Sequence, residues 1–165
     1  MQERPGPVQL TQLLRLLVEH RVRFAVIGGV ALLARGAQRT TEDLDISYAR
    51  DRENLANLAS ALSAIHPKLR GMPPELPFTV DEGALRNGLN FTLDTDLGPL
   101  DLMGEVAGLG DFARVDEASS VLEISGFSLL VLTLDGLERA KRAAGRPKDF
   151  LDLGLIRSLR ESGES

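Results

Sequence analysis

Hydrophobic positions recur with two different spacings along the chain, and the change of spacing predicts where helices give way to strands. Apolar residues three to four apart predict amphipathic helices over residues 8–20 and 52–65. Short, largely apolar runs predict strands over residues 23–27 and 44–48, and a short apolar helix is expected between them over residues 30–37. The first part of the chain therefore alternates helices with strands.

The middle of the chain is less regular. Four of the eight prolines fall within residues 66–88, which predicts an irregular stretch that serves as a lid or substrate loop. Two strands are expected around a turn, over residues 89–95 and 99–103. Further short strands are predicted near residues 112–115, 121–124 and 127–131.

Two helices are expected to close the chain, over residues 134–144 and 149–159. Gly145 would stop the first of them, and Pro147 stands near the start of the second. Taken in order, the elements predict an α/β (α+β) fold, in which a mixed β-sheet is flanked by helices and C-terminal helices follow.

Length and composition suit one compact domain over residues 1–165, with a core over about 8–132 and a C-terminal helical segment over about 133–161. The absence of cysteine excludes disulfides and thiolate metal sites. The apolar runs are far shorter than the roughly 20 residues of a membrane helix, and the N-terminus lacks the pattern of a secretory signal. We therefore expect no membrane partner and a cytoplasmic location.

Charge is distributed unevenly around a formal net charge of -5, which itself argues against a general nucleic-acid-coating protein. Residues 71–126 hold eleven acids and two bases, whereas residues 137–160 hold seven bases and three acids. An acidic middle and a basic end would suit the two sides of a cleft for a metal and a polyanion. The alternative is that both are simply solvated faces.

Asp43 and Asp45 stand two apart on a predicted strand, so their side chains leave the same face. Two adjacent carboxylates repel each other, and both stay ionised readily only with a cation between them. Mg²⁺ prefers carboxylate oxygens and is commonly shared with substrate phosphates. Leu44 and Ile46 would point the other way, into the core. The pair predicts metal-assisted phosphoryl or nucleotidyl chemistry, against the alternative of an exposed strand or a cap.

Gly28 and Gly29 follow the first predicted strand and precede a predicted helix. Without side chains they would let a phosphate approach the backbone, where a helix N-terminus offers free N–H groups. A pair of glycines alone is more often only a turn. The signal gains weight from its distance to the acidic pair, because thirteen residues separate Gly29 from Asp43 and leave room for one helix and a return strand.

This spacing, together with the string Arg39-x-Thr41-x-Asp43-x-Asp45, resembles the signature of the DNA polymerase β-like nucleotidyltransferase superfamily. The local string is similar to that of minimal bacterial members such as the AbiEii-like toxins of toxin–antitoxin pairs. The resemblance implies the nucleotidyltransferase fold, with a glycine turn that holds the triphosphate and an Asp-x-Asp strand that binds catalytic metals.

The resemblance also implies a third carboxylate from a neighbouring strand. Asp101, between two leucines on a predicted strand, is the best match, and it would complete the metal site and accept the proton of the attacking hydroxyl. Asp94 and Asp96 are competing candidates that lie nearer a predicted turn. The alternative for Asp101 is a polar residue on the solvent side of its strand.

A basic motif runs from Lys141, in the last turn of one predicted helix, to Asp149 and Asp152 at the start of the next. Interaction with the helix dipoles explains these charges without function, and Lys148 with Asp152 would make an ordinary i, i+4 pair. The motif is nevertheless similar to the C-terminal motifs of AbiEii-like proteins. That likeness implies that Lys141 neutralises triphosphate charge, while either Asp149 or Asp152 positions a base, a metal or the lysine.

Other polar residues near these motifs are weaker candidates. Arg39 and Thr41 belong to the family-like string and would contact the nucleotide, although Thr41 could instead hydrogen-bond its own turn. Arg35 is expected to be a solvated helix residue. His20 and His66 have no partners at metal-ligand spacing and are expected at the surface.

The resemblance therefore implies an enzyme that moves a nucleoside monophosphate from a nucleoside triphosphate to an acceptor hydroxyl. Its cofactor would be Mg²⁺ (or Mn²⁺), and its nucleoside triphosphate substrate could be ATP. A tRNA or a protein is the leading acceptor, with a small molecule such as an antibiotic also open. A toxin role with a cognate antitoxin partner is the more specific expectation. The alternative is a catalytically silent domain of the same fold that senses nucleotides or binds a partner.

Overall fold

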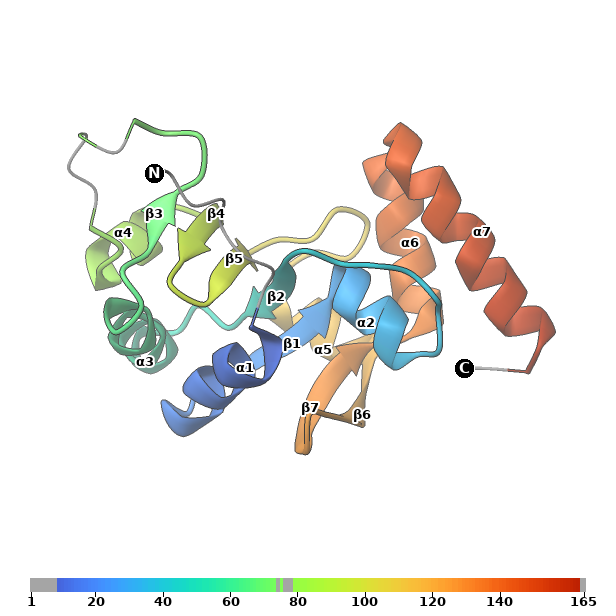
Figure 1. Cartoon of the computed structure of the whole chain (residues 1–165), viewed down its shortest axis with the longest axis horizontal. Helices are drawn as coiled ribbons and strands as arrows, with labels where there is room; N and C mark the ends of the chain where they lie inside the picture. The colour runs from blue at the N-terminus through green and yellow to red at the C-terminus, as the bar shows by residue number, and fades with distance from the viewer. Residues whose placement is uncertain (1–8, 74, 76–78, 164–165) are drawn as a thin grey trace.

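The computed structural model describes residues 9–73, 75 and 79–163, and Figure 1 shows its arrangement. The strands are β1 (Phe24–Ile27), β2 (Leu44–Tyr48), β3 (Lys68–Leu69), β4 (Asn90–Thr95), β5 (Gly98–Met103), β6 (Ser119–Ile124) and β7 (Phe127–Leu132). The helices are α1 (Leu10–Glu19), α2 (Gly28–Ala34), α3 (Arg52–Ser63), α4 (Glu82–Asn87), α5 (Phe112–Glu117), α6 (Leu134–Ala144) and α7 (Pro147–Glu161).

The strands form one mixed sheet in the order β3-β4-β5-β2-β1-β7-β6. At its centre β2 pairs antiparallel with β1 and parallel with β5, and β1 pairs parallel with β7. In Figure 1, α3 and α4 lie at the β3–β4 end of the molecule, while α6 and α7 stand side by side at the other end. The expected mixed sheet flanked by helices, with helices at the C-terminal end, is confirmed.

The core forms where the apolar periods of helices and strands meet. Leu13, Leu14 and Leu17 lie on one stripe of α1 and are fully buried, and each contributes about 1.5–3 kcal/mol by leaving water. Leu44 and Ile46 alternate with Asp43 and Asp45 and are fully buried as well. The buried side of β2 therefore fixes the strand whose other side carries the carboxylates.

The stretch 66–88 was expected to be irregular throughout, and that expectation is wrong in part. It contains β3 and α4, and α4 begins where the side chain of Asp81 accepts a hydrogen bond from the Ala84 backbone N–H. Leu85, fully buried, then packs this single helical turn and a half into the core. Pro74 and Pro77, which weighed toward irregular structure, lie outside the described residues, as does Val8 at the predicted start of the first helix.

The strand expected at residues 112–115 is also wrong. These residues begin helix α5, because the Asp111 side chain accepts a hydrogen bond from the Arg114 backbone N–H and caps the turn. Val115 is fully buried in this helix. Four residues are too few to separate an apolar strand from one helical turn by period, so the capping acid decides the structure.

The C-terminal helices are joined by a tight turn that follows from two residues. Gly145 adopts a left-handed conformation with φ 61° at the end of α6, and Pro147 occupies the first turn of α7. The side chain of Thr133 caps the start of α6 by accepting a hydrogen bond from the Gly136 backbone N–H. None of the described helices is long and apolar enough to cross a membrane.

Candidate active site

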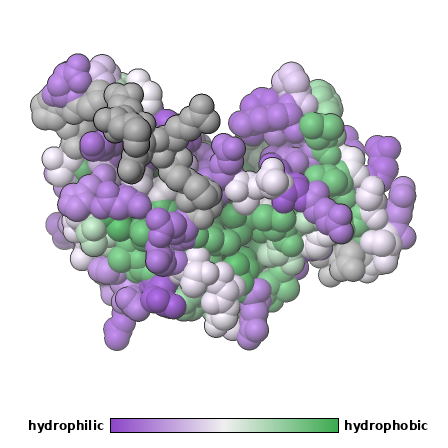
Figure 2. Space-filling model, in the orientation of Figure 1, coloured by the Kyte–Doolittle hydropathy of each residue, from purple (hydrophilic) through white to green (hydrophobic). Residues whose placement is uncertain are grey.

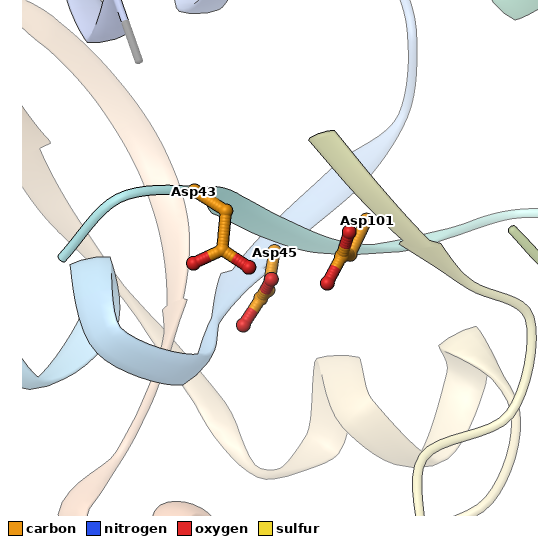
Figure 3. Close-up of side chains that lie close together, drawn as sticks. All are labelled: Asp43, Asp45 and Asp101. Carbon is orange, nitrogen blue, oxygen red and sulfur yellow. The ribbon is translucent and has the colours of Figure 1, made fainter. Parts of the chain in front are cut away.

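Three carboxylates meet at the centre of the sheet. The parallel register of β2 and β5 places Asp45 opposite Asp101, and Asp43 precedes β2 on the same side of the strand as Asp45. One oxygen from each of the three side chains lies within 4.8 Å of the others. Figure 3 shows these carboxylates gathered in one place, two from the start of β2 and one from β5.

Burial and mutual repulsion make this cluster electrostatically costly. Burial chiefly, and then the charges of Asp43 and Asp101, raise the pKa of Asp45 to about 8. Burial likewise raises the pKa of Asp101, although the Arg70 guanidinium acts in the opposite direction. The Oδ1 atom of Asp45 is buried and, among the described residues, has no hydrogen-bond partner.

Those features fit a divalent cation. Three convergent carboxylate oxygens are the hard donors that Mg²⁺ and Mn²⁺ accept, and a cation would supply the buried Asp45 oxygen with a partner. It would also offset the burial and the repulsion that raise the pKa of Asp45. Asp94 and Asp96, the competing acids, instead pair with Arg70 and His66, so Asp101 is the acid of this region that joins the cluster.

Gly28 and Gly29 begin α2 directly beside the carboxylates. Gly28 has a φ of 66°, which strains other residues, and a Cβ there would lie 3.0 Å from Cγ of Asp45. A Cβ on Gly29 would lie 2.8 Å from Oγ1 of Thr41. Neither position has room for a side chain, so the glycine pair keeps the backbone open next to the acids.

Thr41 and Arg39 support this arrangement through protein contacts. The Thr41 hydroxyl donates a hydrogen bond to the Asp43 carbonyl at 3.1 Å, so it holds the turn that presents the first acid. An Arg39 nitrogen lies 2.5 Å from an Asp152 oxygen, which joins the loop before β2 to helix α7. Direct contact of either residue with a nucleotide stays a prediction.

Lys141 lies in the last turn of α6 and faces two acids of α7. Its Nζ is 2.8 Å from an Asp152 oxygen and 3.3 Å from an Asp149 oxygen. Burial favours a protonated Asp149, but hydrogen bonds from Arg146 and the charge of Lys141 prevail and lower its pKa to about 2. Asp152 is thus paired with Arg39 and Lys141 in place of the simple Lys148–Asp152 pair that helical spacing allows.

A cavity of about 320 Å³ joins the acidic and basic groups. Gly28, Asp45, Lys141 and Arg146 are among the residues that line it. Its remaining walls are largely apolar and come from β7, α6 and the loop after β5; they include Val106, Ala107, Leu132, Leu137, Ala140 and Ala144. Figure 2 shows a notch in the upper outline of the molecule between the β3–α4 end and the α6–α7 end.

Two arginines of this region escaped the sequence interpretation. Arg146 lines the cavity and lies inside the basic motif, so its place between Lys141 and Asp149 was a usable signal. Arg70 contacts Asp101 at 3.0 Å although the two are 31 positions apart, and its sequence neighbourhood carries no signal of that contact.

Arg35 contradicts its expected exposure. It is buried at the end of α2 and donates hydrogen bonds to the carbonyls of Val131 and Leu132 and to the Ser120 hydroxyl. The end of α2 lies over β6 and β7, so the guanidinium satisfies sheet carbonyls instead of reaching solvent. His66, by contrast, is exposed as expected.

Comparison with known proteins agrees with this geometry. Among solved structures, the chain is similar to the lincosamide antibiotic adenylyltransferase LnuA bound to lincomycin, with 14% identity, 92% of this chain and 96% of that chain covered, and a TM-score of 0.60. A provisionally assigned nucleotidyltransferase from Thermotoga maritima matches with 19% identity, 92% and 91% coverage and a TM-score of 0.57. The complex of ANT(2")-Ia with adenylyl-2"-tobramycin matches with 16% identity, 93% coverage of both chains and a TM-score of 0.55.

At these identities the solved structures establish the nucleotidyltransferase fold alone. No curated protein matches the sequence. The model of the family described as nucleotidyl transferase AbiEii toxin, type IV toxin–antitoxin system, matches residues 12–106, which include both glycines and all three acids. Because that match spans more than half of the sequence, the chain belongs to the AbiEii family of toxin nucleotidyltransferases and is a transferase.

Proposed function

We propose that this chain moves a nucleoside monophosphate from a nucleoside triphosphate to an acceptor hydroxyl, with Mg²⁺ or Mn²⁺ held by Asp43, Asp45 and Asp101. One observation carries the proposal. Three carboxylate oxygens converge within 4.8 Å beside the open Gly28 backbone, at a cavity that Lys141 also lines. A cavity lined by one of these acids, Asp45, and by the Lys141 ammonium suits a substrate that carries both a metal and phosphates.

Each residue has a distinct part in the proposed reaction. The divalent cation, when bound, supplies charge neutralisation at the reacting phosphate. Gly28 and Gly29 leave room for the triphosphate, and the Lys141 ammonium attracts it into the cavity. Asp101 accepts the proton of the acceptor hydroxyl. The hydroxyl oxygen bonds to the α-phosphorus, the bond to the bridging oxygen breaks, and pyrophosphate leaves.

The remaining polar residues act through these groups. Asp149 and Asp152 hold the ammonium of Lys141 in place, because both carboxylates are buried and both form an ion pair with it. Thr41 holds the backbone of Asp43, and Arg39 ties the same loop to Asp152. The nucleotide site thus draws on both ends of the chain, and we regard residues 1–165 as a single nucleotidyltransferase domain.

For the acceptor, we propose a tRNA or a protein hydroxyl, in keeping with a toxin whose partner is a cognate antitoxin and whose reaction takes place in the cytoplasm. A small molecule is the second candidate, because two of the structural neighbours are described with the antibiotics lincomycin and adenylyl-tobramycin. A catalytically silent domain is disfavoured, since a silent member has no need to retain three convergent carboxylates with an unpaired buried oxygen.

The test is transfer of label from each α-³²P-nucleoside triphosphate, with Mg²⁺, onto total tRNA, total cell protein, lincomycin or tobramycin. Asp43→Asn is the test variant, and Asp96→Asn, which removes an exposed acid paired with His66, is the matched control. Label that appears with wild type and the control but not with Asp43→Asn supports the proposal and identifies nucleotide and acceptor class. Equal labelling by Asp43→Asn would refute the assignment of the metal site.

A further inference from the structure

Arg70 brings a positive charge to one of the three site acids from the edge of the sheet. It follows the short strand β3, and its Nη2 atom lies 3.0 Å from Oδ1 of Asp101. The Asp101 side chain is 13% exposed, whereas the Arg70 side chain is 35% exposed. A guanidinium from an outer strand therefore contacts a carboxylate at the centre of the sheet.

The position of this guanidinium is set by contacts other than the one to Asp101. Its Nε atom lies 3.1 Å from Oδ1 of Asp94, and its Nη2 atom donates to the Leu93 carbonyl at 2.8 Å. The Arg70 backbone N–H donates to the Thr92 carbonyl at 2.9 Å. All three partners belong to β4, which lies between β3 and β5. The guanidinium is thus anchored on one strand, and its Nη2 atom also donates to Asp101 on the next strand.

Two physical consequences follow for Asp101. A hydrogen bond from a fixed, planar donor restricts rotation of the carboxylate, so the oxygens keep one orientation toward Asp43 and Asp45. The same positive charge opposes the approach of another cation to that carboxylate. Arg70 would therefore improve the geometry of the acidic cluster while it weakens the attraction of the cluster for a metal.

We propose that Arg70 is a positioning residue, which orients Asp101 for proton acceptance and holds the metal affinity of the acidic cluster below the value that three carboxylates alone would give. This inference rests on the proposed function of the cluster. It assigns a role in that site to a residue outside the glycine turn, the acidic pair and the basic motif. Weaker metal binding favours release of metal and pyrophosphate after each transfer.

A purely structural role is the competing explanation, because Arg70 also fastens β3 and its following turn to β4. The two explanations predict different effects of the substitution Asp94→Asn. Asp94→Asn removes an anchor of the same guanidinium and leaves the charge beside Asp101 in place, whereas Arg70→Gln removes that charge. Arg70→Lys keeps a charge but loses the planar fork. Arg86→Gln, on an exposed arginine of α4 paired with Glu82, is the surface control.

The experiment measures Mn²⁺ binding by electron paramagnetic resonance in the absence of nucleotide, together with steady-state transfer kinetics, on the full chain. We expect Arg70→Gln to bind Mn²⁺ about fivefold more tightly, because a nearby positive charge is removed. Its kcat should fall about tenfold, while KM for the nucleotide changes less than about threefold. Arg70→Lys should keep Mn²⁺ affinity within about twofold of wild type and restore part of kcat.

Two outcomes would overturn the inference alone. In one, Arg70→Gln binds Mn²⁺ with the affinity of wild type; in the other, Asp94→Asn changes the Mn²⁺ affinity as much as Arg70→Gln does. Asp45→Asn separates the inference from the proposed function, since its loss of Mn²⁺ binding establishes the metal site independently of Arg70. If wild type binds no Mn²⁺ at all, the inference falls together with the proposed metal site.

Discussion

Asp45 on β2 and Asp101 on β5 are direct partners in a parallel strand pair, although they are 56 positions apart in the sequence. Side chains at partnered positions of adjacent strands lie on the same face, so the strand register itself brings the two carboxylates together. The register is fixed by the buried residues on either side of Asp45, because a shift by one residue would turn Leu44 and Ile46 to the face that carries the carboxylates. The packing of the core therefore also fixes the positions of the two carboxylates relative to each other.

Asp45→Asn should abolish transfer and at the same time stabilise the metal-free protein. The pKa of Asp45 is raised to about 8, above its unfolded value, so its contribution to stability is fully present below about pH 4 and is lost as pH rises through 8. The amide of asparagine does not ionise, so it avoids the cost of a buried carboxylate at high pH. We expect a gain on the order of 5 kcal/mol at pH 8, which calorimetry in chelator should show as a higher Tm for the variant. A lower Tm for the variant would contradict the assigned cause.

Acid should weaken the contact between α6 and α7 through Asp149. Its folded pKa of about 2 lies below the unfolded value, so the stability it contributes is present above about pH 4 and disappears as pH falls through 2. The loss should be on the order of 2 kcal/mol in urea unfolding. Asp149→Asn should flatten that part of the pH profile, and Asp135→Asn, at the exposed end of an Arg160 pair, should leave it unchanged.

Lys141→Met should lower kcat/KM about 100-fold, which corresponds to roughly 3 kcal/mol of lost transition-state stabilisation. The substitution removes the ammonium that lines the cavity and leaves Asp149 and Asp152 paired only with arginines. Arg142→Met, next in sequence but exposed and paired with Glu138, is the control and should keep activity within about twofold. The measurement is steady-state kinetics as a function of nucleotide concentration. Equal effects of the two variants on kcat/KM would show that Lys141 is not part of the site.

Gly28→Ala should destabilise the protein by about 1–3 kcal/mol and eliminate activity. The left-handed backbone strains any side chain, and the added methyl group would displace Asp45. Gly154→Ala is the opposite case, because this glycine lies inside α7 with open space around it, and it should stabilise the protein by about 0.5–1 kcal/mol. Chemical denaturation measures both, and a neutral Gly28→Ala would show that the turn tolerates a side chain.

Local patterns predicted the parts of this molecule that local physics determines. The spacing of Asp43 and Asp45 placed two carboxylates on one face, and the leucines around Asp101 placed it on a strand, as the structure has them. Both C-terminal helices follow from their period, from Gly145 and from Pro147. The register between β2 and β5 could not be predicted, because it depends on how the segment between them packs.

The errors share one physical origin. Short helices, and contacts between residues far apart in the chain, produce no recognisable pattern in the sequence. The single helical turns of α4 and α5 depend on the caps Asp81 and Asp111, and four to six residues carry no reliable period. Arg35 looked like a solvated residue because its acceptors, the β7 carbonyls, are almost a hundred residues away. The contact between Arg70 and Asp101 exists only once β4 is in place.

Because α6 and α7 supply part of the proposed site, synthesis of the chain must pass both helices before that site is complete. The three acids are present once synthesis has passed Asp101, but Lys141 belongs to α6, and its partners Asp149 and Asp152 to α7. An incomplete chain that ends before these helices holds an acidic cluster without the Lys141 ammonium. On the proposed function, such a chain should show no transfer until both helices have been synthesised.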